Sequence, residues 1–127
     1  MADESTPTFA IPKHPIRRYQ RRGGVEYDGE TVFSLSPEAE RDDESLTQLV
    51  EQVIDGESYR YGDWFDLPMP LYLVHDDRTG DTFRTAVRDG VIELHVLPDT
   101  GPEGLRVFYQ RIEALSETAW NVTCRTD

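Results

Sequence analysis

The chain has 127 residues, with 25 acidic and 13 basic side chains and a net charge of −12. Its length suits one domain, and 13 aromatic residues within periodic apolar segments favour a folded chain over a disordered one. No apolar run approaches the roughly 18 residues of a membrane-spanning helix, and the N-terminal segment lacks the apolar stretch of a secretory signal. We therefore expect a cytoplasmic protein. Its single cysteine excludes an internal disulfide.

The basic residues are unevenly chosen, because all of them except Lys13 are arginines. This acidic, lysine-poor composition resembles that of small acidic proteins of salt-accumulating haloarchaea. Carboxylates hold water where molar salt competes for it, and a Debye length of roughly 3 Å at 1 M salt screens the repulsion between them. The resemblance implies a halophilic protein, whose surface carboxylates are ordinary features and weak signs of a metal or acid–base site.

The N-terminal segment, residues 1–24, differs from the rest. Its first half is small, polar and proline-bearing, which predicts a disordered lead. Residues 13–22 carry five basic side chains and no acidic one, whereas residues 23–127 have a net charge of −15. We therefore divide the chain into a lead with a basic arm, over 1–24, and a single domain over 25–127.

The first half of the domain shows one short strand, one helix and a loop. Thr31–Leu35 reads as a strand. Ser45 is a suitable N-cap, with Gln48 completing a capping box, and Gly56 is a suitable stop. Between them one apolar face repeats at helical spacing: Leu46, Leu49, Val50, Val53 and Ile54. Tyr59–Pro70 is aromatic and proline-punctuated, which predicts a loop covering part of the core.

Three strands are expected next, over Leu71–His75, Thr82–Arg88 and Val91–Leu97. Asp89-Gly90 predicts a two-residue type I′ hairpin, which pairs Arg88 with Val91. This register puts the apolar side chains of both strands on one face. The opposite face then carries Arg84, Arg88, Glu93 and His95.

A second helix and a last strand complete the domain. The helix follows Thr100, a candidate N-cap, and repeats Leu105, Phe108, Ile112 and Leu115 at spacings of three and four. The strand, Ala119–Cys124, alternates Trp120, Val122 and Cys124, so that we expect Cys124 to be a small core residue. The predicted core comprises Leu49, Val53, Phe83, Val87, Ile92, Leu94, Leu105, Phe108, Ile112, Trp120 and Val122.

These elements predict the α+β class, with an antiparallel β-meander sheet and helices on one face. Their order is α-β-β-β-α-β, with room for one or two strands before the first helix. This order resembles the core of type III secretion chaperone-like domains, and in part profilin-like and PAS-like sheets. The resemblance implies a fold and carries no motif that identifies an activity.

No catalytic constellation is evident, and we assign no catalytic residue, metal site or cofactor. His14 lies in the arm, while His75 and His95 fall on strands separated by a third, about two strand spacings apart. This spacing predicts two half-exposed sheet histidines rather than a zinc site. Cys124 lacks an evident base that would activate it as a nucleophile.

The first functional hypothesis is a non-enzymatic protein-interaction module, expected to be a homodimer. Its candidate surface is the aromatic segment, in which exposed rings would form a binding patch for a partner or a second copy. The residues are Tyr59, Tyr61, Trp64, Phe65 and Met69. The alternative for this segment is burial against the sheet. A free edge of the sheet equally favours a dimer.

The second hypothesis is a nucleic-acid-associated protein that uses the basic arm. Arginines would contact phosphates while a tyrosine stacks on a base, through Arg17, Arg18, Tyr19, Arg21 and Arg22. The alternative is an arm docked on its own acidic body, with Ile16 and Tyr19 packed and the arginines facing carboxylates. We expect this docked arrangement, because molar salt weakens phosphate contacts.

The third hypothesis is a small-ligand-binding or enzymatic domain with a pocket near Trp64. A cleft that held Asp63, His95 or Arg84 beside Trp64 would favour it. The sequence leaves the identity of any ligand or partner open.

Overall fold

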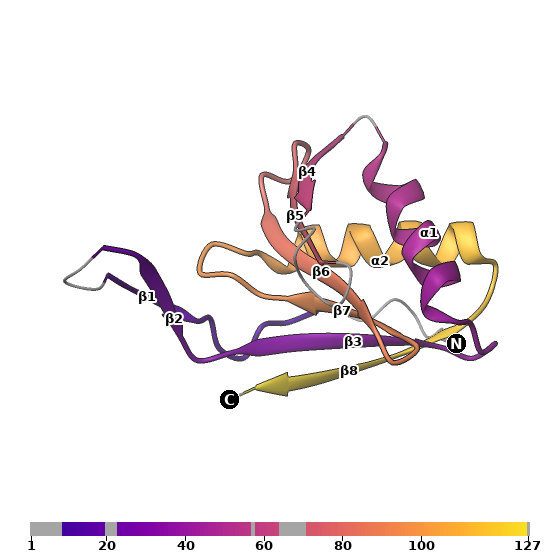
Figure 1. Ribbon diagram of the computed structural model, residues 1–127, viewed down its shortest axis with the longest axis horizontal. Coiled ribbons are helices and arrows are strands. Elements are labelled where there is room, and N and C mark those ends of the chain that lie inside the picture. The colour runs from indigo at the N-terminus through magenta and orange to yellow at the C-terminus, as the bar shows by residue number, and fades with distance from the viewer. Residues whose placement is uncertain (1–8, 20–22, 57, 64–70, 127) are drawn as a thin grey trace.

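The computed structural model describes residues 9–19, 23–56, 58–63 and 71–126. In chain order its elements are β1 (Ile16–Tyr19), β2 (Val25–Asp28), β3 (Thr31–Pro37), α1 (Asp43–Ile54), β4 (Tyr59–Asp63), β5 (Leu71–Asp76), β6 (Thr82–Arg88), β7 (Val91–His95), α2 (Pro102–Ser116) and β8 (Trp120–Thr126). One antiparallel sheet has the strand order β4-β5-β6-β7-β3-β8, and β1 and β2 form a separate hairpin (Figure 1). The predicted α+β class is confirmed.

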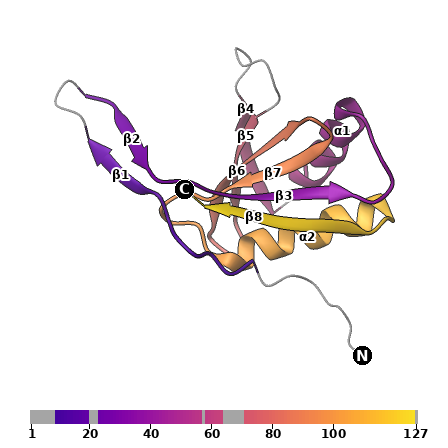
Figure 2. The same ribbon diagram turned by 90° about the horizontal axis from the view of Figure 1, so that it is seen from below.

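Both helices lie together over one face of the six-stranded sheet, where they enclose the core (Figure 1). The strands alternate accordingly: in β6, Phe83, Thr85 and Val87 are buried against the helices, while Arg84 and Arg88 belong to the other face. Seen from below, β3 and β8 run side by side along one margin of the sheet (Figure 2). Among the described residues, no helix covers the second face of the sheet.

The β6–β7 hairpin has the predicted register. Val87 pairs with Ile92 and Arg88 with Val91. The turn residues Asp89 and Gly90 both have positive φ angles, of 55° and 78°, as a type I′ turn requires. The dipeptide Asp89-Gly90 therefore correctly predicted how the two central strands β6 and β7 pair.

The predicted core is confirmed almost throughout. Phe83, Ile92, Leu94, Phe108 and Ile112 have no exposed surface. Phe108 stands edge-on to Phe83, with ring centroids 5.3 Å apart, so that α2 is fixed on the sheet by aromatic packing. The remaining predicted positions are also buried, apart from Val122, which is partly buried: Leu49, Val53, Val87, Leu105 and Trp120.

Both helices begin differently from the prediction. The N-cap of α1 is Asp42, whose carboxylate accepts a hydrogen bond from the Ser45 amide at 2.8 Å. Asp caps as well as Ser does, and an earlier start puts two more acidic residues in the first turn, where the helix dipole favours them. The N-cap of α2 is Gly101, not Thr100. Thr100 instead accepts a hydrogen bond from the Leu97 amide.

The segment Tyr59–Asp63 forms strand β4, so the prediction of a loop there is wrong. It pairs along its whole length with β5, with Tyr59 opposite Asp76 and Asp63 opposite Tyr72. Tyrosines suit an edge strand that has one buried face, and pairing with β5 outweighs the weak strand preference of Gly62. The rest of the predicted loop, residues 64–70, lies outside the described residues.

The expected disordered lead is wrong for the residues from Phe9 onward. Phe9 is only 2% exposed, and its ring packs 5.1 Å from that of Phe33 and 5.5 Å from that of Tyr109. Pro15 is buried, and the His14 ring donates a hydrogen bond to the Thr100 carbonyl at 2.7 Å. The folded body therefore starts well before the predicted boundary at residue 25, because one aromatic side chain outweighs its polar neighbours.

Candidate functional site

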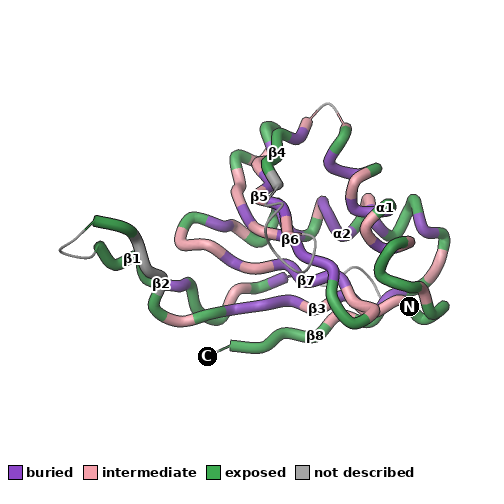
Figure 3. The backbone as a smooth tube through the Cα atoms, viewed as in Figure 1, coloured by how far each residue is buried: buried purple, intermediate pink, exposed green. Residues whose placement is uncertain are grey.

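The basic arm is a two-stranded hairpin that projects from the body. β1 pairs with β2 from Ile16 opposite Asp28 to Tyr19 opposite Val25. The hairpin extends away from the six-stranded sheet, and β1 is exposed along its length (Figures 1 and 3). We refer to β1 and β2 as the arm hairpin.

The expected docking of the arm on its own body is wrong. Ile16 is 54% exposed and Tyr19 is 74% exposed, so neither side chain is packed. Arg18 pairs within the hairpin, with Asp28 at 2.8 Å, rather than with a carboxylate of the body. The strands satisfy each other's backbone groups, which lets the hairpin stand free. Arg21 and Arg22 lie outside the described residues.

The base of the arm hairpin is fixed to the body. The Thr31 hydroxyl donates a hydrogen bond to the Lys13 carbonyl at 2.6 Å, and the neighbouring His14 is bound to Thr100. The arm hairpin is therefore held at its base, and the residues of β1 are exposed to solvent. Because strand side chains alternate, Ile16 and Arg18 fall on one face of β1, and Arg17 and Tyr19 on the other.

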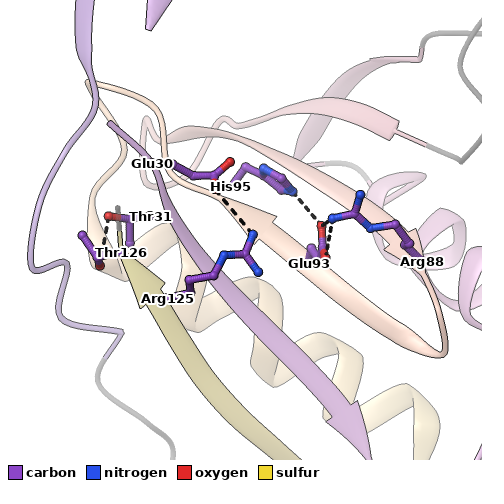
Figure 4. Close-up of polar contacts among 7 residues, drawn as sticks. All are labelled: Glu30, Thr31, Arg88, Glu93, His95, Arg125 and Thr126. Carbon is purple, nitrogen blue, oxygen red and sulfur yellow. Dashed lines mark hydrogen bonds and ion pairs between the residues drawn. The ribbon is translucent and has the colours of Figure 1, made fainter. Parts of the chain in front are cut away.

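The helix-free face of the sheet carries a charged network near this base, drawn in Figure 4. Arg88 Nη2 donates to both carboxylate oxygens of Glu93, at 3.0 and 3.1 Å, and His95 Nε2 donates to the same carboxylate at 3.0 Å. Glu93 is only 5% exposed although no helix covers it. Its cross-strand neighbours Ala86 and Ser34 are small, which leaves room for the two longer side chains to lie across it.

The network sets the protonation state of Glu93. Burial alone would raise the pKa of this carboxyl group, but the hydrogen bonds and charges of Arg88 and His95 outweigh burial and lower it. Glu93 is therefore an anion that holds its two partners in place. The sequence prediction that these side chains share one face of the meander is confirmed.

A small pocket of about 170 Å³ lies between this network and the base of the arm. Arg84 and His95 line it from the sheet, and Pro15, Glu30 and Thr31 line it from the arm side. Glu30 pairs with Arg125 at 3.5 Å (Figure 4). The pocket holds two of the groups that the enzyme hypothesis named, but Trp64 lies outside the described residues. Within those residues no hydroxyl or thiol is hydrogen-bonded to His95, whose partner is Glu93.

The structure divides the predicted aromatic surface. Tyr59 is buried, whereas Tyr61 is 43% exposed and donates a hydrogen bond to Asp55 at 2.7 Å. Trp64, Phe65 and Met69 lie outside the described residues, so the patch as a whole stays a prediction.

The remaining chemistry-bearing residues lie apart. His75, in β5, bonds to the Thr82 hydroxyl, and β6 separates it from His95, in β7. Both are partly exposed, as predicted. Cys124 is exposed on β8, so its predicted place in the core is wrong: β8 is an edge strand, and α2 covers only its start. Among the described residues, no group of three His, Cys, Asp or Glu side chains could hold a metal ion.

Comparison with known proteins returned no match, whether to a family model, a curated protein or a solved structure. Over the part of the chain that the structure describes, no helix has the length and apolar character needed to cross a membrane. The geometry of the chain itself is therefore the basis for a functional proposal.

Proposed function

We propose that the protein is a non-enzymatic interaction module that self-associates, with the arm hairpin as its main contact element. The observation that carries this proposal is the exposure of Ile16 and Tyr19 on a hairpin whose base is anchored to the body. Each face of β1 offers one large exposed apolar side chain beside an arginine, and tyrosine and arginine are enriched at protein–protein interfaces.

Charge identifies a second copy as a suitable partner. Residues 13–28, which include Glu26 and Asp28 of β2, have a net charge of +3, whereas residues 29–127 have a net charge of −13, and this acidic remainder is equally present in another copy. Glu38, Glu40 and Glu44 are exposed at the far end of β3 from the arm, and no described basic side chain forms an ion pair with their carboxylates. They offer carboxylates to the arm of a neighbouring copy.

The free edge of the sheet supplies a geometry for such a dimer. β8 closes the sheet, with β3 as its only neighbour among the described strands. If two β8 strands pair antiparallel about a two-fold axis, Thr126 of one copy meets Trp120 of the other. Thr126 pairs with Thr31 beside the arm base, and Trp120 pairs with Pro37 beside the acidic run. Each arm would then reach the acidic run of the opposite copy.

The test is the dimer dissociation constant, measured by sedimentation at fixed KCl concentration. We expect Tyr19→Ser combined with Arg17→Ser and Arg18→Ser to weaken the dimer about tenfold or more, and Glu38, Glu40 and Glu44→Gln to do the same. Arg106→Ser, on the exposed side of α2, is the matched control and should change nothing. A wild-type protein that remains monomeric at high micromolar concentration, or variants that dimerise like wild type, would contradict the proposal.

Nucleic-acid binding is the second candidate function, favoured by the placement of Arg17, Arg18 and Tyr19 on the exposed strand β1. Four phosphate contacts on duplex DNA would give a log–log salt slope of about −0.9 per contact. The comparison is wild type against the variant with Arg17, Arg18, Arg21 and Arg22→Ser. Micromolar binding of duplex or single-stranded nucleic acid at 1 M KCl, lost in the variant, would favour this function over self-association.

A further inference from the structure

A second pocket, of about 420 Å³, lies far from the arm, where α2 meets the ends of β4 and β5. Its lining comprises Ser58, just before β4, Asp77 and Arg78, just after β5, and Arg111 from α2. The Asp77 amide donates to the Ser58 carbonyl at 2.7 Å, so backbone pairing ties the two sheet-side walls together. This volume falls within the range of small-molecule sites.

Arg111 is held in one orientation at this pocket. Its Nη1 donates a hydrogen bond to the Ser58 hydroxyl at 2.9 Å, and its guanidinium carbon stands 5.0 Å above the centroid of the Tyr59 ring. Tyr59 is buried, and burial, opposed by the charge of Arg111, raises its pKa to about 12. The ring is therefore a fixed, neutral platform for the guanidinium.

The second arginine is available to a ligand. The Arg78 amide donates to the Asp76 carboxylate at 2.9 Å, which fixes the turn. Among the described residues, the Arg78 side chain has no hydrogen bond or ion pair, and Arg111 has no carboxylate partner. In a chain with 25 acidic and 13 basic side chains, two such arginines at one pocket are unexpected.

The two aspartates near the pocket do not neutralise both of its arginines. Asp77 Oδ2 pairs with Arg60 at 3.2 Å, and its Oδ1 lies 3.6 Å from His75. Asp76 is fully buried and offsets the charge of one arginine. Among the described residues, three arginines thus face two aspartates around the pocket, a positive surplus within a protein of net charge −12.

We propose that this pocket binds the oxyanion group of a small molecule, and that the side chains of Arg78 and Arg111 donate hydrogen bonds to it. Planar guanidinium groups bind carboxylate and phosphate oxygens through paired N–H donors, and one that is already oriented loses little entropy on binding. The pocket is larger than a single phosphate group needs, so it has room for a ligand with further atoms beyond its anionic group.

Calorimetric titration with potassium pyrophosphate and with potassium citrate, in KCl of matched ionic strength, tests the site. We expect saturable binding of at least one of them, and the tighter one identifies the site as phosphate-selective or carboxylate-selective. Arg78→Gln, at an exposed side chain that supports no packing, should weaken binding about tenfold or more. Arg111→Lys keeps the charge but loses the fork of donors, and should also weaken it.

Arg106→Gln, on the same helix but outside the pocket, is the control and should bind like wild type. Equal affinity of wild type and Arg78→Gln would overturn the proposal, as would the absence of saturable binding at millimolar anion. Thermal melts of each variant without anion would show that the fold is retained. The arm hairpin takes no part in this site, so the result is independent of self-association.

Discussion

The carboxylate of Asp81 caps helix α2 through the amide of Gly104, 23 positions further along the chain. Gly104 N–H donates to Asp81 Oδ2 at 2.7 Å, and Gly101 N–H donates to Oδ1 at 3.1 Å. The N-cap residue itself, Gly101, has no side chain to do this. Asp81 stands directly before β6, so this contact joins the start of the helix to the centre of the sheet.

We expect Asp81→Ala to lower the free energy of unfolding by about 1–2 kcal/mol, because the amides of Gly101 and Gly104 lose their acceptor. Gly104→Ala should also destabilise, since its new Cβ would lie 2.5 Å from Asp81 Cβ and displace the cap. Urea unfolding measures both, with the exposed Asp99→Ala as control. Asp81→Ala with the stability of the control would show that the cap contributes nothing.

Short-range patterns predicted the parts of this fold that neighbouring residues determine. Asp89-Gly90 and the alternation around it gave the β6–β7 register, and helical spacing gave the buried face of α1. The Asp81 cap could not be predicted in this way, because no local signal shows that a carboxylate will meet the end of a later helix. Strand β4 was missed for the same reason, since only its pairing with β5 makes it a strand.

The candidate sites show the same difference between local patterns, which the sequence reveals, and tertiary packing, which it does not. Composition located the basic arm, but its direction depends on the pairing of β1 with β2, which a charge count does not reveal. The grouping of Arg78 with Arg111 arises from tertiary packing of α2 on the sheet, and neither residue belongs to a sequence motif. Phe9 shows the converse error, because averaging over a polar segment conceals one residue that packs in the core.

Phe108 is expected to be among the costliest positions in the core. It is fully buried and contacts the rings of Phe83 and Tyr59. Phe108→Ala should lower the free energy of unfolding by about 3–5 kcal/mol, since it leaves a cavity beneath α2. Leu115→Ala, on the same helix but half exposed, is the matched control and should cost far less. Equal losses in denaturant melts would mean that the core lies elsewhere.

Acid should destabilise the protein partly through Glu93. Because the folded state lowers the pKa of Glu93 below its ordinary value of 4.5, the stabilisation is complete above that pH and is lost as the pH falls through the folded-state pKa. Glu93→Gln should therefore lower stability near pH 7 by about 1–3 kcal/mol and flatten the fall in stability below pH 4.5. Unfolding curves of both proteins across this range decide it. If wild type and Glu93→Gln lose stability equally steeply below pH 4.5, other carboxylates are responsible for the destabilisation by acid.

Salt should stabilise the folded chain. Residues 23–127 have a net charge of −15, and their repulsion is long-ranged at low ionic strength but confined to roughly 3 Å at molar salt. We expect the melting temperature to rise from 0.1 M to about 2 M KCl, with most of the gain at the low end, where screening changes fastest.

The variant with Glu38, Glu40 and Glu44→Gln, which removes three exposed charges, should melt higher than wild type in low salt and gain less from added KCl. Thermal melts of both proteins at low, matched protein concentration separate this effect from self-association. A wild-type melting temperature that stays flat or falls over the series would rule out charge repulsion as a limit on stability, and with it the halophilic interpretation of the composition.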